Sequence, residues 1–130
     1  MLLRGLTGMA LLLVGGYVKD CSPDTAIAKV IDAGVYPMSP SPGDTAFMWV
    51  NYDLPEDVTS GTATYKYTLN YIPFSPIVVP LCDQTVCPLT VGVHNMTGNT
   101  TYPDVSGRLE VQVDWKDSVG RSIWCVKTVY

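Results

Sequence analysis

Two stretches of the chain alternate between apolar and polar residues with a period of two. In Ala63–Tyr71 the odd-numbered positions hold alanine, tyrosine and leucine, and the even-numbered positions hold threonine, lysine and asparagine. In Gly107–Lys116 the alternation is equally regular from Leu109 to Trp115. Successive side chains of a β-strand point to opposite faces of the sheet, so a period of two is typical of a strand with one buried face. The two stretches therefore predict two half-buried strands.

Weaker patterns of β-branched and apolar residues predict five more strands. These are Ala26–Ala33, Phe47–Leu54, Ile77–Val79, Leu89–Val93 and Ile123–Val129. Segments rich in proline, glycine, asparagine and aspartate separate the strands and indicate turns. The predicted turns are Pro37–Gly43, Pro55–Gly61, Pro73–Pro76, Gly98–Gly107 and Asp117–Gly120. Seven short strands with turns at this spacing predict an all-β fold, an antiparallel β-sandwich.

The composition narrows the classes of function. The chain has 130 residues, and its 8 lysines and arginines against 12 aspartates and glutamates give a net charge of −4. Nucleic acid is excluded as a partner, because phosphate binding needs a basic face. With 47% hydrophobic and 15% charged residues, the chain is not largely disordered. At this length we expect a single domain.

The N-terminal segment has the pattern of a secretory signal peptide. Met1–Arg4 carries one positive charge, Leu6–Val14 is a short apolar run, and Gly15 and Gly16 supply small residues for cleavage. The apolar run is short for a membrane span. We therefore expect a signal peptide over residues 1–16 and a mature domain over residues 17–130. A buried N-terminal helix or an uncleaved anchor is the alternative interpretation.

Because the chain is predicted to be exported to an oxidising compartment, its four cysteines, an even number, are expected to form disulfides. Four cysteines allow three pairings. Only four residues separate Cys82 from Cys87, so these two can close a small loop, which leaves Cys21 to pair with Cys125. The rival interpretation is a zinc site. It is disfavoured because the other two cysteines are far apart in the sequence and the chain is predicted to be exported.

Two glycosylation motifs lie in a polar stretch that reads as a loop. They are Asn95-Met96-Thr97 and Asn99-Thr100-Thr101, each with the N-x-[ST] pattern and no proline at the middle position. Sugar on Asn95 or Asn99 would require that this loop face solvent.

Catalytic groups do not form a recognisable set in the sequence. The single histidine, His94, follows a predicted strand, where a lone histidine is usually a surface or structural residue. Most acidic residues fall in predicted turns or on polar strand faces, which suits turn capping and solvation. We therefore expect no enzymatic activity, no cofactor and no metal.

The apolar faces of the predicted strands are large for a two-layer core. They could fill the sandwich interior, which periodicity alone favours. They could instead line a cavity for an apolar ligand between separated sheets. The alternation of Tyr65, Tyr67, Val111, Val113 and Trp115 is compatible with both interpretations.

Several short motifs resemble those of the ML lipid-recognition family. The mature chain opens with Asp20-Cys21-Ser22, has Leu81-Cys82-Asp83 followed by Cys87-Pro88-Leu89, and closes on Gly120–Cys125 with the pattern G-x-x-I-x-C. The family includes sterol-transfer proteins of the Niemann-Pick type C kind and fungal phosphatidylglycerol/phosphatidylinositol transfer proteins. The resemblance spans the chain from Cys21 to its end.

The resemblance implies an immunoglobulin-like β-sandwich with an apolar cavity between its two sheets, and the disulfides Cys21–Cys125 and Cys82–Cys87. The candidate cavity-lining residues are Val50, Tyr52, Tyr65, Tyr67, Leu69, Tyr71, Leu109, Val111, Val113 and Trp115. The candidate residues at the cavity mouth are Phe74, Val86 and Leu89. The chain departs from the family in lacking the cysteines for the third disulfide that some animal members carry. It also lacks a lysine-rich rim, which disfavours lipopolysaccharide as a ligand.

The implied function is that of a lipid-binding protein, secreted or in the lumen of the endolysosomal or secretory pathway. It would shield a sterol or a phospholipid between its sheets and carry it between membranes, with transient membrane contact and a protein receptor as further partners. The alternative is an interaction protein without a usable cavity, such as a recognition co-receptor, an adhesin or a structural component. A close-packed interior would favour that alternative.

Overall fold

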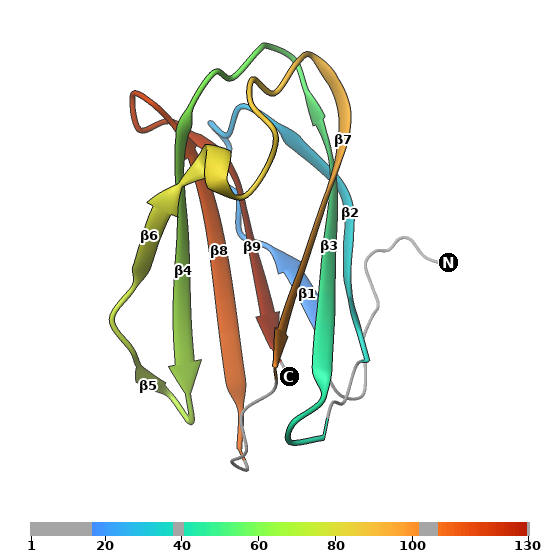
Figure 1. Ribbon diagram of the computed structural model, residues 1–130, viewed down its shortest axis with the longest axis vertical. Helices are drawn as coiled ribbons and strands as arrows, with labels where there is room; N and C mark the ends of the chain where they lie inside the picture. The colour runs from blue at the N-terminus through green and yellow to red at the C-terminus, as the bar shows by residue number, and fades with distance from the viewer. Residues whose placement is uncertain (1–16, 38–40, 102–106, 130) are drawn as a thin grey trace.

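Two antiparallel sheets lie face to face in the protein (Figure 1). The computed structural model describes residues 17–37, 41–101 and 107–129, and the predicted signal peptide lies outside these ranges. The arrangement confirms the prediction of an all-β sandwich. No helix in the described ranges is long and apolar enough to cross a membrane.

The larger sheet contains six strands. In spatial order they are β1 (Tyr17–Asp20), β9 (Ser122–Val129), β8 (Leu109–Asp117), β4 (Gly61–Leu69) and β5 (Ile72–Pro73), with β6 (Ile77–Pro80) also paired to β4. The smaller sheet contains β2 (Lys29–Tyr36), β3 (Thr45–Leu54) and β7 (Gly92–Thr101), in that order. A short 3-10 helix, η1 (Leu81–Asp83), begins the connection from β6 to β7 at one end of the sandwich (Figure 1).

The sandwich core is densest where three aromatic rings meet between the sheets. Trp115 of β8 and Trp124 of β9 are cross-strand partners, and their rings stack at a centroid distance of 4.6 Å. The Tyr52 ring of β3 lies 6.1 Å from the Trp115 ring and 5.8 Å from the Trp124 ring. Leu54 and Leu81 are also completely buried in this cluster. We call these five residues the packed end.

One edge of the sandwich is closed by the chain near its N-terminus. The backbone N–H groups of Ile27 and Ala28, just before β2, donate to the carbonyls of Ser122 and Ile123 in β9, at 2.8 and 3.0 Å. These bonds tie the smaller sheet to the larger one.

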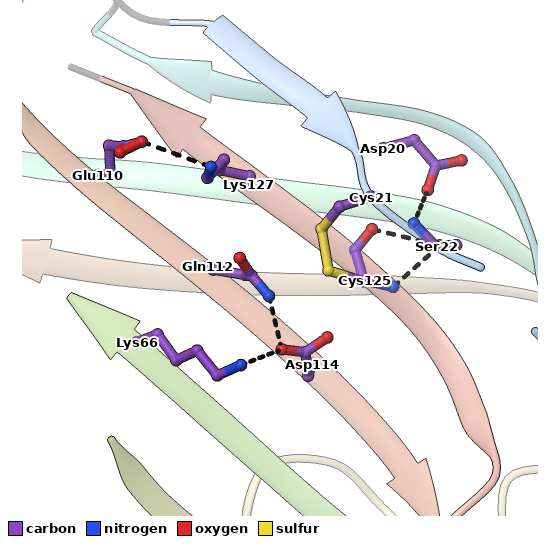
Figure 2. The surroundings of a disulfide bond; sticks show 9 residues. All are labelled: Asp20, Cys21, Ser22, Lys66, Glu110, Gln112, Asp114, Cys125 and Lys127. Carbon is purple, nitrogen blue, oxygen red and sulfur yellow. Dashed lines mark hydrogen bonds and ion pairs between the residues drawn. A yellow bond between two sulfur atoms is a disulfide. The ribbon is translucent and has the colours of Figure 1, made fainter. Parts of the chain in front are cut away.

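A disulfide fastens the same edge. It joins Cys21, directly after β1, to Cys125 in β9, as Figure 2 shows. Beside the disulfide, the backbone N–H of Cys125 donates to the hydroxyl of Ser22 at 2.9 Å. The other two cysteines form the Cys82–Cys87 disulfide, so all four sulfurs are bonded to one another and none is a free metal ligand.

The strand predicted over Ala63–Tyr71 ends earlier, at Leu69. Asn70 and Tyr71 instead form the two-residue loop of the β4–β5 hairpin, with φ angles of 51° and 67°. Two consecutive positive φ angles are the mark of a type I′ turn, in which asparagine is a preferred residue. The alternation therefore continues in the sequence after the backbone has already reversed direction.

The prediction of a loop around the two glycosylation motifs was wrong. The predicted strand Leu89–Val93 overlaps β7 by only two residues, and β7 continues through both motifs to Thr101, paired with β3 along its whole length. The inward positions of β7 hold His94, Met96 and Gly98, a set with little hydrophobic signal, because partners on β3 supply most of the apolar surface. Asn95 and Asn99 are nevertheless exposed, on the outward face of this edge strand.

Candidate functional site

A cavity of about 320 Å³ lies between the two sheets, next to the packed end. Its lining comes from six strands and the η1 connection: Ala46, Met48, Tyr65, Tyr67, Ile77, Val79, Gln84, Met96, Thr97, Gly98, Asn99, Val111, Val113, Trp115 and Thr128. Several of these residues, among them Ile77 and Thr97, are also exposed to solvent. The cavity therefore reaches the surface at the edge of the sandwich between β6 and β7.

The cavity wall is apolar and carries no formal charge. Inward residues of β3 and β7 form one side, and inward residues of β4 and β8 form the other, as the strand alternation requires. Thr128 of β9 is fully buried, and its hydroxyl donates to the sulfur of Met48 at 3.3 Å, which connects the two sheets beside the cavity. A volume near the low end of small-molecule pockets, with a dry wall and few polar groups, suits an apolar ligand.

A polar pair lies at one side of the cavity. The hydroxyl of Tyr65 in β4 donates to Oε1 of Gln84 at 2.6 Å. Burial raises the pKa of Tyr65, the Tyr67 phenol raises it further, and the indole of Trp115 acts in the opposite direction. Tyr65 is therefore a neutral phenol at physiological pH. Gln84 follows η1 within the loop that the Cys82–Cys87 disulfide closes, and η1 packs against β4.

Trp115 forms the boundary between the cavity and the packed end. Its side chain is 1% exposed, and its Nε1 atom has no well-aligned hydrogen-bond partner in the part of the chain that the structure describes, although the indole acts on the Tyr65 phenol as a hydrogen-bond donor. Trp124, which stacks on it within the packed end, likewise has a buried Nε1 without a partner among the described residues. Such groups are rare in folded proteins, because an unpaired buried donor costs free energy.

Five of the ten residues predicted to line a cavity do so. They are Tyr65, Tyr67, Val111, Val113 and Trp115. Val50, Tyr52 and Leu109 are buried in the core beside the cavity, and Leu69 packs partly buried against it. The interior therefore combines both interpretations of the apolar faces: it is filled at one end and hollow next to it.

Tyr71 lies elsewhere. The type I′ turn places it outside β4, 75% exposed, with its ring under the guanidinium of Arg108 at 5.0 Å. The prediction that Tyr71 faces inward is corrected here, because inward alternation holds only within a continuous strand.

The residues predicted at the mouth are also distributed differently. Leu89 is 2% exposed and pairs its backbone with that of Val58, so it belongs to the core and not to a mouth. Val86 is 85% exposed on the disulfide loop. Phe74 is half exposed and lines a second groove, on the outer face of the larger sheet, together with Lys66 and Lys127. The loop residue that reaches the cavity is Gln84.

The sequence interpretation missed the lining residues contributed by the smaller sheet and by β6. These are Ala46, Met48, Met96, Thr97, Gly98, Asn99, Ile77 and Val79, with Thr128 from β9. Only β3 gave a usable signal, through the alternation of Met48, Val50 and Tyr52. Gly98 could not be found from its residue type, since a glycine lines a cavity by leaving space.

His94 has a structural role. Its ring stacks on that of Tyr52 at 5.5 Å, and its Nε2 atom lies 2.6 Å from the carbonyl oxygen of Thr90. The ring therefore supports the packed end from the β7 side.

The fold and the cavity together define a two-sheet β-sandwich that is hollow beside a dense aromatic core. A family model of the ML domain matches residues 17–130. The chain therefore belongs to the ML-domain family, a family of lipid-binding proteins.

Two solved structures show the same fold. A Niemann-Pick type C2 protein from Japanese carpenter ant is 16% identical, with a TM-score of 0.65, and the match covers 85% of this chain and 95% of that one. Chicken MD-1, complexed with lipid IVa, is 13% identical, with a TM-score of 0.64, and the match covers 88% of this chain and 86% of that one. No curated protein sequence matches the chain significantly.

Proposed function

We propose that this protein is a secreted or lumenal lipid carrier that shields a sterol or a phospholipid between its sheets and moves it between membranes. The observation that carries the proposal is the apolar, uncharged cavity that reaches the surface between β6 and β7. Membership of the ML-domain family supports it, as does the lipid IVa bound by the structurally similar MD-1.

The physical value of such a cavity follows from the cost of exposing hydrocarbon to water. At about 0.8 kcal/mol per methylene, a chain of sixteen carbons costs on the order of 12 kcal/mol to expose. Spontaneous exchange between membranes is correspondingly slow. A dry cavity lowers this barrier by extracting, shielding and releasing the lipid, and no covalent bond is made or broken.

A cluster of exposed apolar side chains supports contact with a membrane. Tyr71, Ile72, Phe74, Ile77 and Val78, in and around β5 and β6, are each more than half exposed. Ile77 also lines the cavity, so the cluster is continuous with the cavity opening. An exposed apolar patch of this kind marks an interaction surface, and a bilayer there would receive the lipid directly.

Export and glycosylation belong to the same proposal. The family match begins at Tyr17, directly after the predicted cleavage position at Gly16, and two disulfides suit an oxidising compartment. Asn95 and Asn99 are exposed on β7, where attached sugars would extend into solvent. Mass spectrometry of the protein secreted from eukaryotic cells, before and after removal of N-linked glycans, tests both cleavage and sugar attachment.

The first test of the proposal is the lipid content of the purified protein. We expect organic extracts to contain about one lipid per protein, and the emptied protein to take up a fluorescent sterol or phospholipid. Recovery of no lipid, together with no uptake of either probe, would favour the interaction-protein alternative.

Transfer is tested separately from binding. The double variant Ile72→Ser and Phe74→Ser removes apolar surface outside the cavity, so we expect slower transfer of the probe between vesicles with unchanged uptake. The matched control is Val119→Ser, which removes an even more exposed apolar side chain from the β8–β9 turn, away from the cavity opening. Equal transfer rates for the double variant and the wild type would contradict a role of this cluster in membrane contact.

A further inference from the structure

Three aromatic side chains lie on the outward face of the smaller sheet, away from the cavity. Tyr36 of β2 and Phe47 of β3 are cross-strand partners, and both are exposed. Trp49, two residues further along β3, points to the same face. A Cβ atom at Gly34, the partner of Trp49 on β2, would clash with the six-membered ring of the indole, so this ring lies over bare backbone. We call the three rings the outer aromatic surface.

One of the two glycosylation motifs begins beside this surface. Asn99 of the edge strand β7 is the cross-strand partner of Phe47, so Tyr36, Phe47 and Asn99 form one row across the sheet. Directly opposite residues on one face of an antiparallel pair have Cβ atoms about 4.5–5.5 Å apart. A sugar attached to Asn99 would therefore start next to the Phe47 ring. The row spans roughly 10 Å at about 4.8 Å between strands, which is comparable to the length of a disaccharide.

The other motif has different surroundings on the same face. Asn95 is the cross-strand partner of Asn51, and its amide donates to Oδ1 of Asn51 at 2.6 Å. The amide of Asn51 donates in turn to Oδ1 of Asp32 at 2.7 Å. This row is polar and places no ring directly opposite the attachment point. The two motifs therefore differ in whether the residue opposite the asparagine is aromatic.

The chemistry of the outer aromatic surface suits carbohydrate. A pyranose ring has a face of C–H groups with partial positive charge, and the face of an aromatic ring carries partial negative charge. The sugar hydroxyls remain in water while the C–H groups cover the ring. A bulky, hydrated glycan on β7 would keep this face out of a bilayer and would block pairing of the exposed sheet edge with a second chain.

We propose that the first sugars of an N-linked glycan on Asn99 pack against Phe47 and the neighbouring rings of the outer aromatic surface, and that this contact stabilises the folded protein. The inference rests on the proposed export and glycosylation, and it goes beyond them by giving one glycan a structural partner. A glycan on Asn95 extends into solvent without such a contact. Asn99 also borders the cavity, but a sugar held over the outward face leaves the cavity opening free.

The test compares two singly glycosylated variants secreted from eukaryotic cells. Asn95→Gln keeps only the Asn99 site, and Asn99→Gln keeps only the Asn95 site. Urea denaturation gives the equilibrium constant of unfolding for each variant with its glycan and for the same variant made in the presence of tunicamycin, which prevents N-glycosylation. We expect the Asn99 glycan to lower this constant by about fivefold, the effect of one aromatic contact, and the Asn95 glycan to change it by less than about twofold.

The contribution of the ring is tested with Phe47→Leu, which keeps an apolar side chain on β3 but removes the aromatic face. We expect this substitution to abolish most of the effect of the Asn99 glycan and to leave the effect of the Asn95 glycan unchanged. Phe74→Leu is the matched control, because it removes a similarly exposed ring from the outer face of the larger sheet. It should leave the effects of both glycans unchanged.

A spectroscopic measurement does not depend on the folding of a Phe47 variant. In the two singly glycosylated proteins, endoglycosidase H trims the glycan to its first N-acetylglucosamine, whose C–H protons are then observed by NMR. At Asn99 these protons should move upfield, because they lie over an aromatic ring. At Asn95 they should keep the resonances of a solvated sugar.

The outcomes separate this inference from the function on which it rests. Equal effects of the two glycans on stability, or unshifted sugar protons at Asn99, would overturn the inference and leave glycosylation and lipid binding intact. Secreted protein without sugar on Asn99 would overturn it together with the predicted modification of that residue. Uptake of the fluorescent sterol should be equal with and without the Asn99 glycan, and a lower uptake by the glycosylated form would show that the sugar lies over the cavity opening instead. Lipid extraction tests the carrier function independently of all these results.

Discussion

The two parts of the sandwich interior are built from the same strands but are filled differently. At the packed end, Tyr52, Trp115 and Trp124 meet ring to ring, and Leu81 from η1 covers them. In the neighbouring part, which we call the cavity half, Met48, Met96 and Gly98 of the smaller sheet face Tyr67 and Val111 of the larger one and leave about 320 Å³ unfilled.

The difference comes from the volumes of facing side chains. In both places, successive side chains of a strand point to opposite faces of its sheet, so each strand sends about every second residue inward. At the packed end the inward residues of both sheets are large. In the cavity half the smaller sheet supplies Ala46, whose side chain is a single methyl group, and Gly98, which has no side chain, so neither fills the space up to the opposite wall. A cavity therefore arises without any change in the binary pattern.

The largest expected effect is on the free energy of unfolding, and it differs between the two disulfides. In the chain-closure view, losing Cys21–Cys125, which spans 104 residues, costs about 4.7 kcal/mol of unfolding free energy, and losing Cys82–Cys87, which spans 5, costs about 2 kcal/mol. Gln84, which lines the cavity, lies within the loop that Cys82–Cys87 closes. We expect the double serine variant of Cys82 and Cys87 to weaken lipid uptake, and that of Cys21 and Cys125 to reduce mainly the urea midpoint. The reverse order of stabilities would show that native-state contacts outweigh loop closure.

The next prediction compares one residue from each part. Trp124→Ala removes a large ring from the packed end and should cost about 3–5 kcal/mol, because the rigid surroundings keep the space open. Met96→Ala enlarges a space that is already empty, and should cost about 1 kcal/mol. Urea denaturation of the two variants measures both values. Similar losses would mean that the cavity half is as tightly packed as the aromatic cluster.

A smaller effect concerns acid stability at Asp117, the last residue of β8. Burial favours a higher pKa for Asp117, but hydrogen bonds from the backbone N–H and guanidinium of Arg121 and from the N–H of Val119 outweigh it and lower the pKa. A lowered folded-state pKa adds stability above the unfolded-state value, about 3.9, and this stability is lost as the pH falls through the folded-state pKa.

Asp117→Asn should therefore be less stable than the wild type at neutral pH, with the difference narrowing as the pH falls below about 3.9. Thermal denaturation across this range checks the trend, and Asp24→Asn, at an exposed turn, is the control. A difference that does not depend on pH would show that the charge of Asp117 contributes nothing.

The smallest expected change in stability is that of Gly98→Phe, a substitution that should nevertheless block ligand uptake. A Cβ at Gly98 would meet only the sulfur of Met96, 4.0 Å away, so Gly98→Phe can place its ring in the cavity. We expect uptake of the fluorescent sterol to fall strongly and the unfolding free energy to change by less than about 1 kcal/mol. Val93→Phe, on the outward face of the same strand, should leave uptake unchanged. Normal uptake by Gly98→Phe would place the ligand outside this cavity.

Local pattern predicted the β8 and β9 strands well, because each alternates or is continuously apolar over its whole length. It failed at β7, whose Gly, Asn and Thr residues are typical of a turn, and at Tyr71, where a reversal of the backbone interrupts an unbroken alternation. In both places tertiary pairing overrode the local signal: β3 holds β7 extended, and the hairpin with β5 ends β4.

The amino-acid sequence by itself determined the all-β class, the two faces of the main strands and a disulfide pairing favoured by spacing, since these depend on alternation and on distances along the chain. Only the tertiary structure decided which inward residues fill a core and which surround a cavity. That outcome depends on the volumes of side chains that face each other from strands far apart in the sequence, such as Gly98 and Val111.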